Sequence, residues 1–287
     1  MDALQIEGLC KKYPAFRLED VSFYVPRGKI MGLIGRNGAG KTTTLKALLH
    51  IVQPDTGKIK LLGMDMATQE LDIRRRIGYV SGTAGYYPRK RLGQITAVTR
   101  AFYPDWDAAA YAQYLRRFAL DETKRVCELS EGMKVKFQLA LALSHKAEVL
   151  ILDEPTSGLD PVSRDELLEI FLQLAGQGAT ILFSTHITSD LEHCADAVTL
   201  LQNGRVTLCG AREELLRQYC VARGTAAQLT PALAAAMTGC REHHGEFEGL
   251  LSAKDAALAA GCAVQPATLE QIMVFLERGI RHACDDA

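Results

Sequence analysis

A glycine-rich stretch early in the chain, GRNGAGKTT at 35–43, has the residue types and spacing that bind a phosphate chain. Its glycines let the backbone curl until several N–H groups face one point, and a helix starting after the loop adds partial positive charge there. Lys41 would then reach the β- and γ-phosphates of a nucleotide, and the Thr42 hydroxyl would bind Mg²⁺. A strand pattern precedes the loop and a helix pattern follows it, so we prefer this interpretation to an accidental glycine-rich turn.

An acidic pair follows an apolar run later in the chain, in VLILDEP at 149–155. The continuous apolar run predicts a strand buried on both faces, and Asp153 then emerges at its carboxyl end, where α/β sheets place their ligands. An acid there can hold Mg²⁺ through water, and Glu154 can polarise an attacking water as a general base. Such a pair alone is more often a helix cap, but together with the glycine-rich loop it indicates nucleotide hydrolysis.

The elements that must position these residues alternate between strands and helices. Helix patterns occur at KTTTLKALLH and from about Val162, and Asn203-Gly204 predicts the turn of a hairpin. Residues 92–146 lack strong strand signals and are rich in Ala, Leu and charge, which predicts a helical insert. The strand patterns are LQIEGL, VSFYV, KIMGLIG, KIKLLG, VLIL and ATILFS. This alternation predicts an α/β domain with a largely parallel sheet.

The bulk composition excludes several classes of protein. Lys and Arg number 33 against 34 Asp and Glu, and this balance argues against a protein whose main task is to grip nucleic acid. The eight cysteines form no C-x-x-C pair. The N-terminus shows no signal segment, and no run approaches the roughly 18 apolar residues that cross a bilayer. We therefore expect a reduced, cytosolic and soluble chain, with any membrane-spanning part on another polypeptide.

The motifs follow one another in the order found in the ATP-binding subunits of bacterial ABC transporters, which the chain resembles over roughly residues 2–220. ELSEGMKVKF is similar to the signature of that family, usually written LSGGQ. Ser130 and Gly132 match the signature, while Glu131 and Met133 depart from its commonest form. The resemblance implies that Ser130 caps a helix whose N-terminus points at the γ-phosphate bound by the opposite subunit.

The same resemblance implies roles for three further residues. Asp160, in SGLD, matches the key acid of the loop through which the two subunits communicate, and His186, in STH, matches the residue that contacts the γ-phosphate. Tyr13 resembles the aromatic that stacks on adenine, although an ordinary half-buried loop tyrosine is the alternative. FYPDWD at 102–107 resembles a branch of transporter ATPases of the antibiotic or multidrug exporter type.

The implied fold is a P-loop NTPase core with a mostly parallel sheet, an antiparallel β subdomain and the helical insert, all within an ATPase domain at 1–220. Residues 221–287 are expected to form a small C-terminal accessory region, in which ATLEQIMVFLERG predicts an amphipathic helix. The expected catalytic residues are Lys41, Glu154 and His186, and the expected Mg²⁺ ligands are Thr42 and Asp153. The residues expected to contact ATP are Tyr13, Gly35, Asn37, Gly38, Ala39, Gly40, Lys41, Thr42, Thr43, Ser130, Gly132 and Asp160.

The resemblance implies a subunit that binds and hydrolyses ATP to power a separate integral membrane subunit, with export as the expected direction. A second ATPase subunit, identical or different, would complete the site across the nucleotide, and no nucleic acid partner is expected. The chain would be cytoplasmic, held at the inner face of the cell membrane by its membrane partner. Two alternatives stay open: a non-transport ATPase of the same superfamily that acts on DNA or ribosomes, and a regulatory nucleotide-binding module with low turnover.

Two arginine-rich runs, RRR at 74–76 and RKR at 89–91, have two interpretations. They are either solvated surface, or they flank the groove that receives a cytoplasmic helix of the membrane partner.

One position departs from the family pattern. Aligned on IGYV, the glutamine that bonds to Mg²⁺ and the attacking water in the family falls at Gly82, so only a backbone carbonyl, Ser81, Thr83 or a water could replace it. Because the other site residues are present, we expect the hydrolytic core to persist. Gly82→Gln is expected to tighten Mg²⁺-dependent ATP binding or raise turnover, unless Gly82 and Gly85 have positive φ angles that an added side chain would strain.

Overall fold

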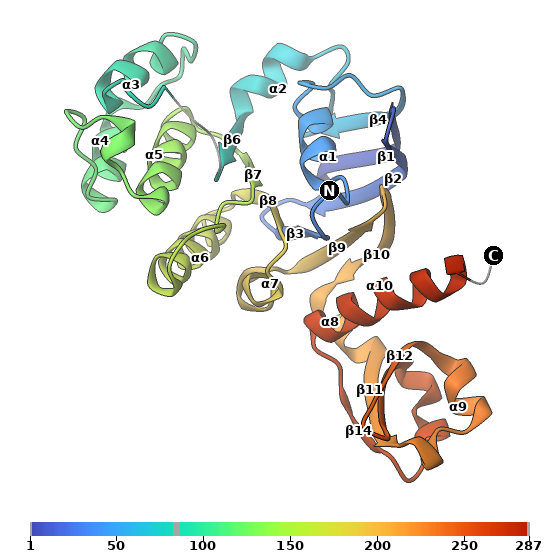
Figure 1. Ribbon diagram of the computed structural model, residues 1–287. Helices are drawn as coiled ribbons and strands as arrows, with labels where there is room; N and C mark the ends of the chain where they lie inside the picture. The colour runs from blue at the N-terminus through green and yellow to red at the C-terminus, as the bar shows by residue number, and fades with distance from the viewer. Residues whose placement is uncertain (1, 83–86, 286–287) are drawn as a thin grey trace. The chain divides into compact units, whose positions relative to one another are not determined.

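The computed structural model describes residues 2–82 and 87–285, so Thr83 and Gly85 lie outside the described residues. It divides the chain into two compact units, Met1–Cys209 and Gly210–Ala287 (Figure 1). A boundary between residues 220 and 221 would fall inside strand β11 (Tyr219–Thr225). The extent of the accessory region therefore stays a prediction.

Six strands form the central sheet of the first unit. They are β3 (Ile30–Ile34), β6 (Ile77–Ser81), β7 (Val149–Asp153), β8 (Thr180–Thr185), β9 (Ala197–Gln202) and β10 (Arg205–Ala211). Their order is β10-β9-β3-β8-β7-β6, and the pairs β9–β3, β3–β8, β8–β7 and β7–β6 are parallel. Every residue of β3, β7 and β8 is buried, as expected of parallel strands covered on both faces. The predicted α/β fold with a largely parallel sheet is confirmed.

The hairpin between β9 and β10 turns at Asn203 and Gly204, as predicted. Both residues have positive φ angles, 48° and 80°, which a two-residue turn of this kind requires. Gly204 N donates to Ala39 O at 3.0 Å, and Gly204 O accepts from Glu19 N at 2.8 Å. The turn therefore ties the glycine-rich loop to the neighbouring antiparallel sheet.

That antiparallel sheet is the predicted β subdomain. It consists of β1 (Asp2–Tyr13), β2 (Phe16–Pro26), β4 (Thr56–Leu61) and β5 (Met64–Asp65), in the order β2-β1-β4-β5. One hydrophobic core joins it to the central sheet and includes Ile6, Phe23, Leu33, Leu45 and Ile151, each 1% exposed or less. Burying these side chains fixes both sheets relative to the loop between them.

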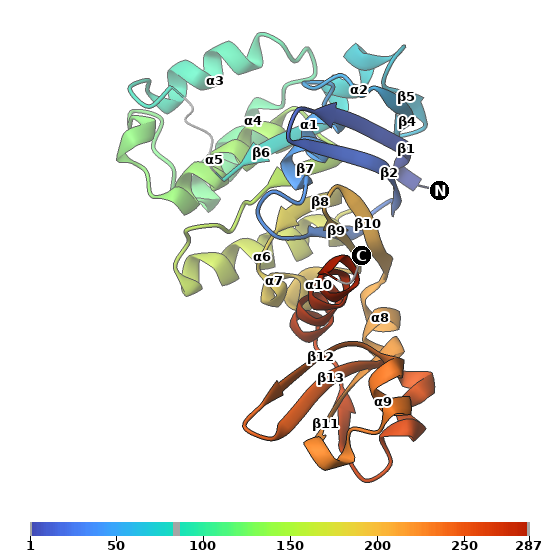
Figure 2. The same ribbon diagram turned by 45° about the vertical axis from the view of Figure 1, so that its right-hand side comes forward.

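Helices cover the central sheet and form the predicted insert. They are α1 (Lys41–Leu48), α2 (Glu70–Arg76), α3 (Leu92–Arg100), α4 (Ala108–Arg117), the short η1 (Val126–Glu128), α5 (Glu131–Ser144), α6 (Pro161–Gly176) and α7 (Thr188–Cys194). Helices α3, α4 and α5 lie together beside β6, at the edge of the central sheet (Figures 1 and 2). The helical insert therefore contacts the core through α5, which packs against β6.

The second unit has its own sheet and core. Besides β11 it contains α8 (Arg212–Gln218), η2 (Ala226–Gln228), α9 (Pro231–Ala236), β12 (Met237–His243), β13 (Glu246–Ser252), η3 (Ala253–Ala259), β14 (Ala263–Pro266) and α10 (Leu269–Asp285). The sheet order is β12-β13-β11-β14, with antiparallel pairs throughout. Helix α10 confirms the helix expected in ATLEQIMVFLERG and packs on β12, burying Ile272 and Phe275.

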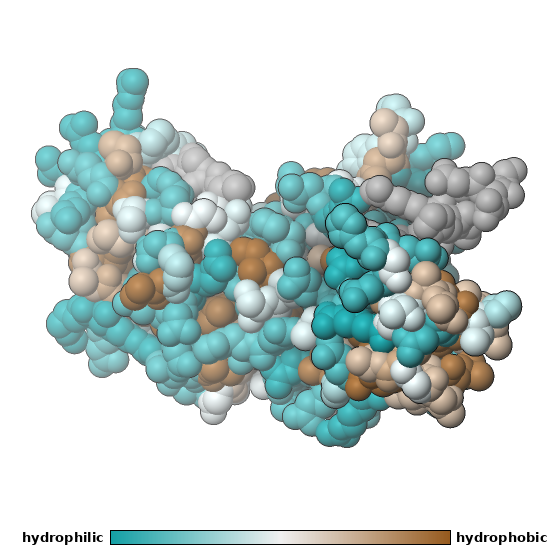
Figure 3. Space-filling model, turned by 60° about the horizontal axis from the view of Figure 1, so that its bottom comes forward, coloured by the Kyte–Doolittle hydropathy of each residue, from teal (hydrophilic) through white to brown (hydrophobic). Residues whose placement is uncertain are grey.

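No helix among residues 2–82 and 87–285 has the length and apolar character needed to cross a bilayer. On the face shown in Figure 3, hydrophilic residues cover most of the surface and hydrophobic ones form small groups among them.

Candidate active site

The glycine-rich loop connects β3 to α1 and depends on glycine at two positions. Gly38 and Gly40 have φ angles of 84° and 109°, in the left-handed region where a β-carbon is strained. A β-carbon on Gly40 would also stand 2.6 Å from Leu18 and 2.8 Å from Phe16, closer than side-chain carbons pack. The loop can therefore fold this tightly only with the glycines that the sequence supplies.

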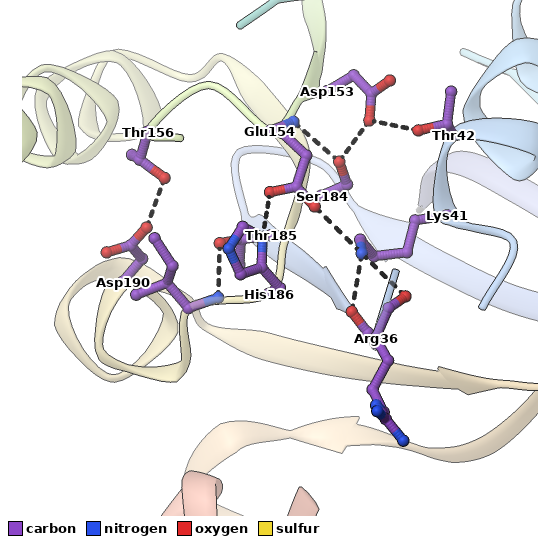
Figure 4. A network of polar contacts seen from close by, with 12 residues as sticks. Arg36, Lys41, Thr42, Asp153, Glu154, Thr156, Ser184, Thr185, His186 and Asp190 are labelled. Carbon is purple, nitrogen blue, oxygen red and sulfur yellow. Dashed lines mark hydrogen bonds and ion pairs between the residues drawn. The ribbon is translucent and has the colours of Figure 1, made fainter. Parts of the chain in front are cut away.

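Lys41 is the first residue of α1 and its side chain is only 5% exposed. Its Nζ donates to the carbonyl oxygens of Gly35 at 2.7 Å and Arg36 at 3.3 Å. It also lies 3.1 Å from Glu154 Oε1, so the glycine-rich loop and the acidic pair meet at this ammonium (Figure 4). The carbonyl and carboxylate oxygens satisfy this buried ammonium group, which can bind phosphate oxygens in the same way.

Asp153 is the last residue of β7, and its carboxylate accepts hydrogen bonds from two hydroxyls. Thr42 Oγ1 donates to Asp153 Oδ1 at 3.1 Å, and Ser184 Oγ donates to the same oxygen at 2.7 Å. Ser184 reaches it because Asp153 and Ser184 are register partners in the β7–β8 ladder. A carboxylate and a hydroxyl at this separation are the hard oxygen donors that Mg²⁺ prefers.

The residues around Thr42 and Asp153 are compatible with a Mg²⁺ site. Throughout the described part of the chain, no group of three or more His, Cys, Asp or Glu side chains could hold a metal. Mg²⁺ does not need one, because it keeps several waters and uses one or two protein oxygens together with phosphate oxygens. Thr42 and Asp153 therefore fit Mg²⁺ carried on a nucleotide.

Glu154 has a backbone conformation that is rare for glutamate. Its φ is 49°, held there by hydrogen bonds from its N–H to Ser184 Oγ at 2.9 Å and Ser184 O at 3.2 Å. The side chain, 17% exposed, places Oε1 at Lys41 and Oε2 at 2.8 Å from His186 Nδ1. Strained residues held by several contacts are common where a side chain must be aimed, and this carboxylate is aimed between Lys41 and His186 (Figure 4).

A buried polar pair supports the loops on the far side of this network. Thr156 Oγ1 donates to Asp190 Oδ2 at 2.6 Å, and both residues are fully buried. Burial raises the pKa of the Asp190 carboxyl, while Thr156 and Arg164, whose Nε is 3.9 Å from Oδ1, act in the opposite direction. The pair joins the segment after the acidic residues to α7, which follows His186.

These side chains surround a cleft of about 610 Å³. Of the predicted site residues, the cleft is lined by Asn37, Gly38, Gly40, Lys41, Thr42, Thr43, Glu154 and His186. Gly35 contributes its carbonyl to Lys41, and Ala39 is buried behind the loop. Tyr13, at the end of β1 and 37% exposed, lies outside this lining, whereas Ala15 and Phe16 belong to it.

Ser130, Gly132 and Asp160 also lie outside the lining of the cleft. Ser130 caps α5 by accepting from Met133 N at 3.2 Å, and Asp160 caps α6 by accepting from Val162 N. Hydrogen bonds from the Ser163 side chain and backbone hold the pKa of Asp160 below its usual value. A β-carbon on Gly132 would stand 3.6 Å from Ser163, so the starts of α5 and α6 are neighbours.

The backbone conformation and the surroundings of Gly82 differ from those considered in the sequence analysis. Its φ is not positive, but a β-carbon built on it would stand 3.1 Å from the carbonyl carbon of Glu154 and overlap the carbonyl oxygen. Gly82 N donates to Asp153 O at 2.9 Å, which brings the two backbones this close. Of the two outcomes considered for Gly82→Gln, this geometry favours strain over benefit, because the backbone of Glu154 occupies the space that the added side chain would need.

Comparison with known proteins identifies the chain. Residues 18–157 match the ABC transporter family. The chain is 37% identical over 225 residues to YxlF of Bacillus subtilis, an uncharacterized ABC transporter ATP-binding protein, covering 75% of this chain and 73% of that protein. The chain belongs to the ATP-binding subunits of ABC transporters. As a member of this family it is an ATPase.

Two further similarities agree. This ABC ATPase is 38% identical over 201 residues to the Nod factor export ATP-binding protein I of Burkholderia lata, covering 68% of this chain and 66% of that protein. A solved structure described as the ATP binding subunit of an ABC transporter superposes with a TM-score of 0.68 and 34% identity. It covers 75% of this chain and 92% of that chain. The P-loop NTPase fold inferred from the motifs is thus confirmed.

Several residues that shape this ATPase site were not predicted from the sequence. Ser184 orders both acids, and it is the first residue of the STH motif, in which only His186 was assigned a role. Phe16 lines the cleft because of the path of the chain between β1 and β2, which no motif encodes, and Arg36 lies in the glycine-rich stretch but was assigned no role there. Asp190 lies four residues after His186, in the first turn of α7, and could have been suspected only from its position.

Proposed function

We propose that this subunit hydrolyses ATP–Mg²⁺ in the cleft at Lys41 and Glu154, and that the cycle drives a separate membrane subunit that exports its substrate. The observation that carries the hydrolytic part is the network in which Glu154 contacts Lys41 through one oxygen and His186 through the other. A cation for phosphate, a carboxylate for water and an imidazole beside it are the groups that phosphoryl transfer needs in one place.

The loop and its helix bind the phosphates in this proposal. The backbone N–H groups of 36–43 and the start of α1 offer donors and partial positive charge. Lys41 exchanges its carbonyl partners for the β- and γ-phosphate oxygens, since a phosphate is the stronger acceptor. Thr42 and Asp153 hold Mg²⁺, whose charge offsets the charge that develops on the phosphate oxygens.

Glu154 orients and deprotonates the attacking water. Its backbone is fixed by Ser184 and its side chain is held from both sides, so the carboxylate needs little reorganisation before it accepts a proton. His186 holds the carboxylate through Nδ1 and presents the rest of its ring, which is 45% exposed, to the γ-phosphate.

A second copy of an ATPase subunit completes the site. Ser130, Gly132 and Asp160 lie outside the cleft that holds Lys41, and Ser130 is exposed at the start of a 14-residue helix. A capped helix start with exposed donors suits an anion that arrives from outside the chain. We assign these three residues to the nucleotide bound by the partner subunit.

The membrane subunit docks on α3 in this proposal. A groove of about 400 Å³ is lined by Tyr87, Lys90, Gln94, Ile95, Val98 and Thr99. Val98 is 63% exposed, so an amphipathic helix of the partner would bury it.

The first arginine-rich run is paired with Glu70, Asp72 and Glu148, and Lys90 of the second run lines the groove. Export is supported by the similarity to the Nod factor export proteins.

Glu154→Gln tests the hydrolytic assignment. The variant should bind ATP normally, lose turnover by about 10²–10⁴-fold, and accumulate as an ATP-bound dimer, because only proton acceptance is removed. Phosphate release and light scattering with ATP–Mg²⁺ measure the two effects. Glu166→Gln, on the exposed side of α6, is the control and should behave as wild type. Near-normal hydrolysis by Glu154→Gln would show that another group activates the water.

Val98→Asp tests the docking surface. A charge in the groove should release the subunit from the membrane fraction of cells that make its partner, while ATP hydrolysis by the purified chain is kept. Leu172→Asp, on α6 and 37% exposed, is the matched control and should leave membrane association intact. Equal membrane association of both variants would place the docking site elsewhere.

A further inference from the structure

Gln138 makes an unusual contact between the helical insert and the central sheet. It lies on α5, and its side chain is buried, with 5% of the residue exposed. Its Nε2 donates to Ser81 O at 3.0 Å and its Oε1 accepts from Ser81 N at 3.0 Å. One side-chain amide thus satisfies both backbone polar groups of a single residue, as a neighbouring strand would.

Ser81 is the last residue of β6, which is the edge strand of the central sheet. Among the described residues, no further strand pairs with its outward N–H and C=O, and buried backbone groups of this kind require a partner. Gln138 supplies that partner. The end of the edge strand is therefore held by α5, the same helix that Ser130 caps.

The held strand end lies directly against the two acids. Ser81 is the register partner of Asp153, and the next residue, Gly82, donates to Asp153 O at 2.9 Å. Gly82 has no side chain, and its backbone contacts the carbonyl group of Glu154. A displacement of Ser81 by a few tenths of an ångström would therefore reach the backbone that sets the direction of the Glu154 carboxylate.

We propose that Gln138 is a positioning residue that couples α5 to Glu154 through the backbone of Ser81 and Gly82. Ser130 and Gln138 are about 12 Å apart on one rigid helix, at 1.5 Å per residue. When Ser130 engages a nucleotide, the movement of α5 is carried by the Gln138 amide to the strand end and so to the general base. The inference rests on the proposed function, because it needs Glu154 to act on water and Ser130 to contact nucleotide.

Gln138→Met tests the coupling, because methionine has nearly the same shape and offers no comparable hydrogen bonds. The full-length variant should show a kcat about tenfold lower with the KM for ATP unchanged within about twofold, a size within the net contribution of the two hydrogen bonds to Ser81 that are lost. A residue with only a structural role would lower the melting temperature and leave the kcat of the folded protein unchanged.

Gln202→Met is the matched control. Gln202 is another buried glutamine of the first unit, on β9 and 2% exposed, and its amide has no hydrogen-bond partner within the described residues. The same substitution there should leave kcat at the wild-type value. Should Gln138→Met not fold, Gln138→Asn serves instead, since it keeps a neutral amide but is one methylene shorter and so cannot bond to both Ser81 N and Ser81 O.

A double-mutant cycle with Ser130→Ala gives the decisive measurement. If Gln138 transmits the effect of Ser130, the loss caused by Gln138→Met should shrink to less than about twofold in the Ser130→Ala background. Additive losses, or a wild-type kcat for Gln138→Met at a temperature where it is fully folded, would overturn the inference. Failure of the proposed function has a different signature, namely near-normal hydrolysis by Glu154→Gln.

Discussion

The carbonyl group of Glu154 fills the space that a side chain on Gly82 would need. Gly82 directly follows β6, and Glu154 directly follows the neighbouring strand β7. The hydrogen bond from Gly82 N to Asp153 O holds the two backbones close together. Glu154 itself has a left-handed backbone that is held by two bonds to Ser184. The direction of the proposed general base therefore depends on a backbone contact that only glycine permits.

Gly82→Ala should accordingly disturb both stability and hydrolysis. The added methyl group meets backbone that cannot rotate away, so we expect a loss of about 1–3 kcal/mol in the free energy of unfolding, typical of overpacking. The kcat for ATP should fall as Glu154 is displaced. Thermal unfolding followed by the fluorescence of Trp106, the only tryptophan, and steady-state phosphate release measure the two effects.

The control for this change is Gly176→Ala. Gly176 ends α6, and a β-carbon on it would meet nothing within 4 Å. Alanine should be neutral or stabilise the helix there by up to about 1 kcal/mol. Wild-type stability and turnover in Gly82→Ala would show that the strand end yields easily, and the backbone contact would then have no role in positioning Glu154.

Much of this arrangement could be predicted, because it is encoded in short stretches of sequence. Glycines before Lys41 specify a tight loop, the apolar run before Asp153 specifies a buried strand, and Asn203-Gly204 specifies a hairpin turn. Each of these signals is local. Parallel strands then bring the ends of β7 and β8 together, so the acids and His186 had to lie near one another.

The remaining features depend on contacts between distant segments. Gln138 lies in an apolar helix pattern, and nothing in its neighbourhood predicts that both ends of its amide meet Ser81. The importance of Gly82 comes from the path of Glu154, which is far away in the sequence. Thr156 and Asp190 are each ordinary polar residues until the fold buries them together. Long-range pairing of this kind leaves no periodic signal.

Ser130→Asp should abolish ATP-driven dimerisation without unfolding the chain. Aspartate caps a helix as well as serine, so α5 should keep its start and the melting temperature should change little. Its charge, however, would face the γ-phosphate of the partner and repel it. Light scattering of Ser130→Asp in the Glu154→Gln background, with and without ATP–Mg²⁺, measures the dimer.

Ser130→Asn provides the neutral comparison, because asparagine caps equally well and carries no charge. It should retain more ATP-dependent dimer than Ser130→Asp. If both variants dimerise like the parent, the start of α5 does not contact nucleotide, and the assignment of Ser130 to the partner's site is wrong.

Thr156→Val should destabilise the first unit through Asp190. Valine keeps the shape of threonine but removes the hydroxyl that donates to a fully buried carboxylate. Loss of a hydrogen bond to a charged group costs about 1.5–3 kcal/mol, and little water can reach the carboxylate to replace it. Thr156→Ser keeps the donor and should lose less than about half as much. Equal losses from both variants, measured by denaturant unfolding, would mean that the methyl group rather than the hydroxyl matters.

The second unit should be acid-sensitive because of Glu248. Its side chain, 9% exposed, accepts from Arg223 Nε at 2.8 Å and Nη2 at 2.6 Å and forms an ion pair with Arg241. Burial acts to raise the pKa of the Glu248 carboxyl, but hydrogen bonds and charge from the two arginines outweigh burial and hold the pKa below its usual value. A lowered pKa in the folded state means that the contribution to stability is present above the unfolded value and is lost as the pH falls through the folded value.

Glu248→Gln should therefore lower the free energy of unfolding of the second unit at about pH 7 by about 1–2 kcal/mol, a figure reduced because both arginines are half exposed. The difference from wild type should start to shrink as the pH falls below the usual glutamate pKa of about 4.3, and it should vanish once the pH has fallen through the lower pKa of the folded carboxylate. Circular dichroism follows both units, whereas Trp106 fluorescence follows only the first, so the shift should appear in the circular dichroism signal alone.

Glu246→Gln, an exposed change on the same strand, should leave both signals at their wild-type midpoints. A constant difference between Glu248→Gln and wild type at every pH would show that shape, and not the ion pairs with Arg223 and Arg241, accounts for the loss.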